Sequence, residues 1–125
     1  MDHVKVCINS VFPGGLEASL ASAFEDGELL DYYSVNDDGT VEHEAQMRKC
    51  MGGCAGPAES VVRRGVEKMI VRSISSGSFL TLHLGGVRIY LSSKASVRES
   101  LHMLIEGSLR ETEISEYSSL SRKIE

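Results

Sequence analysis

At 125 residues, 42% of them hydrophobic, the chain is long enough for one domain with its own core, and three cysteines, an odd number, argue against a disulfide framework. No apolar run reaches the roughly 18 residues of a membrane span, and the N-terminus lacks a signal-peptide layout, so we expect a cytoplasmic protein without a membrane partner. The net charge of −5 and the lack of aromatic residues among the basic positions argue against a nucleic-acid partner.

The first half of the chain predicts three strands. Alternating apolar residues indicate a strand at Val4 to Asn9, and a β-rich stretch indicates a second at Leu29 to Val35. Turn residues at 36 to 39 then close a hairpin onto a third strand, Thr40 to Met47. Between the first two strands, a weak helical pattern predicts a short helix at Leu16 to Phe24.

The third predicted strand carries a histidine on its inward face. Strict alternation places on this face Val41, His43, Ala45 and Met47, and on the other face Glu42, Glu44 and Gln46. A core histidine that bonds to the backbone is the simpler interpretation of His43. The functional alternative is a nitrogen ligand to a metal bound in the loop that follows.

The second half of the chain alternates helices and strands. Pro57 suits the first position of a helix with one buried stripe, and an apolar strand follows at residues 68 to 74. A short helix is predicted at residues 78 to 84 and a strand at residues 87 to 91. Ser96 and Glu99 have the spacing of a capping box, which predicts the start of a last helix that Gly107 ends.

This order of elements predicts the α/β class, with a mixed five-stranded sheet and helices packed on it. In such sheets, ligands bind beyond the carboxyl ends of the parallel strands. That edge is expected to hold Asn9 and Ser10, residues 72 to 76 and residues 92 to 95. The domain is expected to span residues 1 to 111, followed by a loose tail, rich in Ser and Glu, at 112 to 125.

A glycine-rich loop with two cysteines joins the third strand to the first long helix. Cys50 and Cys54 share this loop with Gly52 and Gly53, which let the backbone turn sharply and approach a ligand closely. The positive end of the helix at Pro57 favours a thiolate and an anionic ligand. Inert packing of the thiols is the alternative. The cysteine spacing differs from the usual zinc motif, and no second cysteine pair completes four ligands.

Charge is distributed unevenly along the chain. Residues 6 to 47 include nine acidic residues and no Lys or Arg, whereas residues 48 to 98 include nine basic residues and two acidic ones. A cationic segment that begins at the cysteine loop suits a small anionic ligand, with Lys49 and Arg72 as candidate contacts. A basic face that is merely solvated is the alternative.

Several phrases in the chain are similar to those of one family. They are Gly14-Gly15-Leu16, Gly65 to Val71, Ile74-Ser75, Phe79 with Leu82, Gly86 to Tyr90, and Val97 to Leu109 with Glu106-Gly107. In order and spacing, they resemble the dinitrogenase iron-molybdenum cofactor biosynthesis family, which includes NifX, NafY and the C-terminal part of NifB. The resemblance covers nearly the whole chain up to about Glu111.

The resemblance implies a ribonuclease-H-like fold and non-catalytic binding of a metal–sulfur cluster. Nuclease chemistry is disfavoured, because the first strand offers Cys7 and Asn9 rather than carboxylates that could hold two metal ions. Arg72 stands where the family commonly has a glycine, which offers an anion contact instead. The cysteine pair is not a general family feature and marks a specialised member.

Three functions fit these residues. The first is a carrier of an anionic iron–sulfur or molybdenum–sulfur cluster, held by Cys50, Cys54 and His43 and exchanged with a donor or acceptor protein. The second is a thiol redox protein in which the two loop cysteines cycle to a disulfide. The third is an interaction module whose cysteines share a structural zinc with a partner or a second subunit. An edge strand is also compatible with a homodimer.

Overall fold

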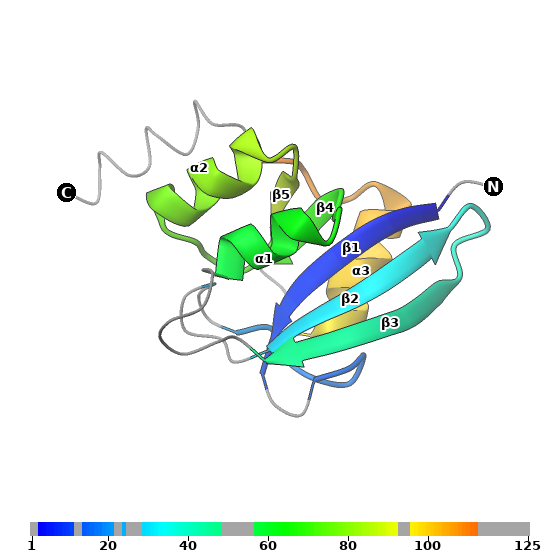
Figure 1. Ribbon diagram of the computed structural model, residues 1–125. Helices are drawn as coiled ribbons and strands as arrows, with labels where there is room; N and C mark the ends of the chain where they lie inside the picture. Colours follow the sequence, from blue (N-terminus) through cyan, green and yellow to red (C-terminus); the bar gives the residue numbers. More distant parts are fainter. Residues whose placement is uncertain are drawn as a thin grey trace.

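The computed structural model describes residues 3 to 11, 14 to 21, 24, 29 to 48, 57 to 92 and 96 to 112. Figure 1 shows the elements that these residues form. They are β1 (His3–Ser10), β2 (Leu29–Asn36), β3 (Val41–Arg48), α1 (Pro57–Arg63), β4 (Lys68–Val71), α2 (Ser76–Leu84), β5 (Arg88–Leu91) and α3 (Val97–Glu106). In the part of the chain that is described, no helix is both long and apolar enough to cross a membrane.

The five strands form one mixed sheet in the order β3-β2-β1-β4-β5, which confirms the predicted α/β architecture. β1 pairs antiparallel with β2 and parallel with β4, and β4 pairs parallel with β5. Since β3 is antiparallel to β2, it runs in the same direction as β1. β1, β3, β4 and β5 therefore end at one edge of the sheet, at Ser10, Arg48, Val71 and Leu91, which we call the carboxyl edge.

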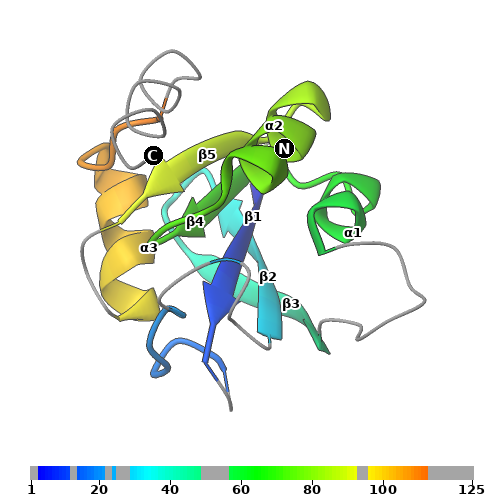
Figure 2. The same ribbon diagram turned by 90° about the vertical axis from the view of Figure 1, so that its left-hand side faces the viewer.

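Helices cover both faces of the sheet. Figure 2 shows α3 on one side and α1 on the other. Val61 of α1 and Leu82 of α2 are fully buried in the core on one face, and Val97 and Leu101 of α3 are buried in the core on the opposite face. Burying each such side chain contributes about 1.5–3 kcal/mol, so the two apolar layers hold the helices to the sheet.

The predicted helix at Leu16 to Phe24 is wrong over residues 16 to 21. The N–H of Ala21 donates instead to the carbonyl of Asn9 at 3.0 Å, and the carbonyl of Ala18 accepts from the N–H of Val97 at 3.0 Å. These bonds to β1 and to the start of α3 satisfy backbone groups that a helix would have paired internally. Tertiary pairing therefore outweighs a weak local helical preference.

The other predicted elements are present with shifted bounds. β4 ends at Val71 rather than at residue 74, and α2 begins at Ser76 because the Ser75 hydroxyl accepts from the N–H of Ser78 at 3.3 Å. Ser96 caps α3 in the same way, and Gly107 ends α3 with a φ of 80°. Both predicted ends of the last helix are thus confirmed.

The contact between α1 and α2 depends on a glycine. A Cβ at Gly85, the residue after α2, would lie 2.5 Å from Cγ2 of Val62 on α1. Valine is stiff about χ1 and is partly buried here, so it has little freedom to move away. Gly77, inside α2, has nothing within 4 Å of its own Cβ position.

We expect Gly85→Ala to lower the free energy of unfolding by about 1–3 kcal/mol, because overpacking forces the two helices apart. Gly77→Ala is the matched control, and it is expected to raise the free energy of unfolding by up to about 1 kcal/mol through better helix propensity. Urea unfolding of both variants measures the difference. If Gly85→Ala had the same free energy of unfolding as wild type, the close approach of α1 and α2 at this residue would be contradicted.

Candidate functional site

The carboxyl edge holds a completely buried carboxylate. Both oxygens of Asp31, on β2, are used: Oδ2 accepts from the Ser10 hydroxyl at 2.5 Å and from the Gly15 N–H at 3.0 Å. Oδ1 accepts from the Gln46 side-chain amide at 2.8 Å, and Nε2 of His43 lies 3.0 Å away. This Asp31 cluster ties β1, β2 and β3 to the loop that follows β1.

The hydrogen bonds decide the charge of Asp31. Burial by itself raises the pKa of this carboxyl, but the bonds from Ser10, Gly15, Gln46 and His43 outweigh burial and hold the pKa below its ordinary value of 3.8. Asp31 is therefore ionised at neutral pH and can only accept hydrogen bonds. It follows that Nε2 of His43 is the donor, and Nδ1 is the nitrogen that a neutral ring leaves unprotonated.

A β-bulge turns His43 and Gln46 toward the same face of the sheet. The register of β2 and β3 shifts between Tyr32 and Tyr33, which pair with Ala45 and with His43. Glu44, which lies between these two residues of β3, is the extra residue of the bulge. The alternation of side chains between the two faces of the sheet is therefore broken at Glu44. The prediction that Ala45 shares a face with His43 is therefore wrong.

The surroundings of His43 also differ from the expected ones. Its ring stacks on Tyr33 with 4.8 Å between centroids, and its partner is the Asp31 carboxylate rather than a backbone group. The side chain is 39% exposed. His43 is thus a histidine that is oriented by a buried carboxylate while part of its ring reaches the surface.

Gly14 lies against the Asp31 cluster. Its φ is 79°, a region that side chains disfavour, and a Cβ at this position would lie 2.8 Å from Oδ2 of Asp31 and overlap the Gln46 amide. Both the backbone conformation and the close approach therefore require glycine. This is a physical reason for Gly14, the first residue of the Gly14-Gly15-Leu16 phrase that the sequence associates with the family.

Two of the predicted site residues, His43 and Arg72, lie in the described part of the chain. Outside the described residues lie Lys49, Cys50, Gly52, Gly53 and Cys54. Arg48, the last residue of β3, pairs with Leu29, which in turn pairs with Ser10. β3 therefore ends at the carboxyl edge, beside the Asp31 cluster, and Cys50 follows two residues later in the sequence. Among the described residues, no three His, Cys, Asp or Glu side chains are grouped in a way that could hold a metal ion.

Arg72 lines a cavity of about 470 Å³ at the other end of the carboxyl edge. The cavity is bounded by Leu91 and Ser92 at the end of β5, by α3, and by residues 108 to 112. The sequence singles out Arg72 but misses Arg110, a second arginine in this lining. No local pattern marks Arg110, because only the fold brings the segment after α3 alongside β5.

Removing the charge of Asp31 is expected to weaken the fold in a pH-dependent way. At pH 7, Asp31→Asn should lower the free energy of unfolding by about 2 kcal/mol or more, since a buried charged acceptor is lost. The pKa of Asp31 is lowered in the folded state. The contribution of its charge to the free energy of unfolding is therefore complete above about pH 4, and it is lost as the pH falls through the folded-state pKa. Urea unfolding of wild type and variant between pH 7 and pH 3 measures this.

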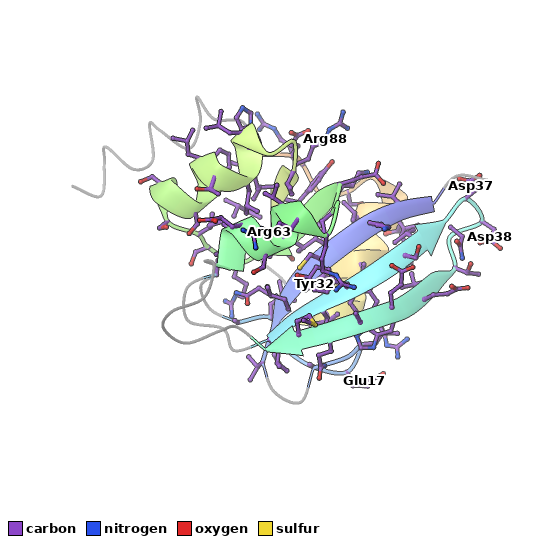
Figure 3. The ribbon with its side chains drawn as sticks, in the orientation of Figure 1. Glu17, Tyr32, Asp37, Asp38, Arg63 and Arg88 are labelled. Carbon is purple, nitrogen blue, oxygen red and sulfur yellow. The ribbon has the colours of Figure 1, made fainter. Side chains whose placement is uncertain are left out.

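The matched control is Asp37→Asn, which removes the same charge from the hairpin turn at the opposite end of β2 (Figure 3). Asp37 is exposed, so its replacement is expected to leave stability nearly unchanged. If the free energy of unfolding differed between wild type and Asp31→Asn by the same amount at every pH down to 3, the assigned charge of Asp31 would be contradicted.

No family model and no curated protein matches the sequence. Solved structures do match. A proposed dinitrogenase from Methanocaldococcus jannaschii superposes with a TM-score of 0.68 at 20% identity, covering 90% of this chain and 97% of that one. A proposed NifB protein from Thermotoga gives a TM-score of 0.62 at 28% identity, with 86% and 92% covered.

A third match is the orange protein from Desulfovibrio gigas, solved in its apo form. It superposes with a TM-score of 0.66 at 13% identity, and the match covers 86% of this chain and 92% of the orange protein. The chain thus shares its fold with these three proteins over most of its length. The structure matches therefore bear out the resemblance, first indicated by the sequence, to the dinitrogenase iron-molybdenum cofactor biosynthesis family.

Proposed function

We propose that the protein binds and carries an anionic metal–sulfur cluster during cofactor assembly, without catalysing a reaction. The observation that carries this proposal is the end of β3 at the carboxyl edge, two residues before Cys50 and beside the pair formed by Asp31 and His43. Ligands of α/β sheets bind at this edge. The fold shared with a proposed NifB protein supports the same conclusion.

In this proposal, Cys50 and Cys54 supply thiolates and His43 supplies a nitrogen. Soft thiolates suit iron–sulfur and molybdenum–sulfur clusters. The hydrogen bond between His43 and Asp31 supports a ligand role, because metal-bound histidines commonly donate their other ring N–H to a carboxylate. Gly52 and Gly53 would allow close backbone approach.

Three ligands leave positions open on the metal, which suits a cargo that must leave again. Lys49 is the cation that offsets the negative charge of the cluster. The carrier would work in the cytoplasm between a protein that donates the cluster and one that accepts it. These partners follow from the chemistry of a carrier, since a cluster bound for transfer needs a source and a destination.

We expect the protein, purified without oxygen and incubated with iron and sulfide or with thiomolybdate, to absorb visible light and to retain the metal through gel filtration. Cys50→Ser/Cys54→Ser should lose both the absorption and the metal. Cys7→Ala is the matched control, because Cys7 is fully buried in the core and should not contribute. Elemental analysis and visible spectra provide the measurement.

The outcomes separate the carrier from its alternatives. A colourless protein that retains zinc through the same cysteines would point to the interaction module instead. A colourless, metal-free protein whose two loop cysteines form a reversible disulfide would point to a thiol redox role. Either result would overturn the carrier proposal.

His43→Ala tests the nitrogen ligand. Loss of an outer partner of a metal ligand costs about 10–100-fold in affinity, so loss of the ligand itself should release the cluster to a chelator at least tenfold more readily. The control is His102→Ala, since His102 lies exposed on α3 and pairs with Glu106. Equal cluster retention in wild type and His43→Ala would remove His43 from the site.

A further inference from the structure

The cavity beside β5 is formed by parts of the chain that are distant in sequence. Arg72 follows β4, Leu91 ends β5 and Ser92 comes after it, and residues 108 to 112 follow α3. This last segment is fastened to β5, because the N–H of Thr112 donates to the carbonyl of Ile89 at 2.8 Å. The volume of about 470 Å³ is within the range of about 300–1,000 Å³ that small-molecule sites occupy.

The described lining of the cavity has an excess of positive charge. The guanidinium groups come from Arg72 and Arg110, and Glu111 is the one acidic residue among the described lining residues. The Glu111 carboxylate lies 4.0 Å from Nε of Arg88, which offsets its charge. The cavity is therefore electrostatically suited to an anion, although the protein as a whole carries a charge of −5.

Apart from Glu111, the polar side chains of the described lining carry hydrogen-bond donors. Hydroxyl groups are contributed by Ser108 and Thr112, whereas the Ser92 hydroxyl is buried and bonds to that of Ser100 at 2.8 Å. Guanidinium forks match the geometry of phosphate oxygens, and hydroxyls add further donors to the same acceptors. Two arginines and two hydroxyls exceed what a single carboxylate needs, so a phosphate group fits better.

The rest of the wall is apolar, at Leu91, Met103 and Leu109, and the cavity is larger than a phosphate ion requires. We propose that this cavity binds a small organic phosphate, with the phosphate group held by Arg72 and Arg110 and the organic body packed against the apolar wall. This goes beyond cluster carriage and assigns Arg72 to a second ligand.

The test measures binding of ribose 5-phosphate and of adenosine monophosphate by calorimetry and by amide NMR, with ribose and adenosine as the matched probes that lack phosphate. We expect saturable binding of the phosphorylated probes alone, with shifted resonances at residues 91, 92 and 108 to 112. Arg72→Gln or Arg110→Gln should weaken binding about tenfold or more. Arg63→Gln, the control, removes an exposed charge from α1 (Figure 3) and should bind as wild type does.

Glu111→Gln keeps the test informative if an arginine variant folds poorly. This substitution removes a negative charge, which repels a phosphate, from the lining, and it releases Arg88 from its ion pair with Glu111. The variant should therefore bind the phosphorylated probes more tightly than wild type. A misfolded variant could not show this gain. No saturable binding of either phosphorylated probe, or weaker binding in Glu111→Gln, would overturn the proposal. Inorganic phosphate binding as tightly as the organic probes would contradict an organic ligand.

The same variants separate this inference from the carrier function. Cys50→Ser/Cys54→Ser should bind the phosphorylated probes as wild type does, and Arg72→Gln/Arg110→Gln should retain the colour of a bound cluster. Loss of colour in the arginine variant, with phosphate binding unchanged, would overturn the inference and assign Arg72 to the cluster. A colourless wild type that still binds the probes would overturn the carrier function alone.

Discussion

The buried carboxylate of Asp31 constrains the half of the carboxyl edge that β1, β2 and β3 form. A fully buried charge is tolerated only where hydrogen bonds replace its lost hydration, and here a hydroxyl, a backbone N–H, an amide and an imidazole surround it. To bring them together, β1 must pair with β2, β3 must carry a bulge, and the following loop must pass close enough to require Gly14. One carboxylate thus links strand register, loop conformation and the orientation of His43.

The carboxyl edge is chemically divided along the sheet. At its β3 end, the Asp31 cluster orients an imidazole next to the start of a loop rich in sulfur, a combination of soft ligands. At its β5 end, arginines and hydroxyls line a cavity, a combination of hydrogen-bond donors that suits an anion. The parallel strands β1, β4 and β5 bring both ends to the same edge, because strands that run in one direction finish together. The two proposed ligands, a metal–sulfur cluster and an organic phosphate, differ in chemistry as the two ends of this edge do.

Local patterns predict most of the fold because its elements follow from short-range physics. Ser96 and Gly107 bound α3 through a cap and a positive φ, both of which depend on a few neighbouring residues. The candidate site is less predictable. Asp31 lies in a β-rich run where nothing in the sequence separates it from exposed carboxylates, and the bulge that turns Gln46 toward it breaks the alternation on which strand predictions rest.

By itself, the sequence determined the α/β class, the order of the strands and helices along the chain and the ends of the last helix, because periodicity, capping and composition are local properties. The tertiary structure alone decided that residues 16 to 21 form no helix, that His43 bonds to a carboxylate, and that Arg110 joins Arg72 in one cavity. These outcomes depend on groups that are at least 12 residues apart in the chain and that meet only when strands pair and helices pack.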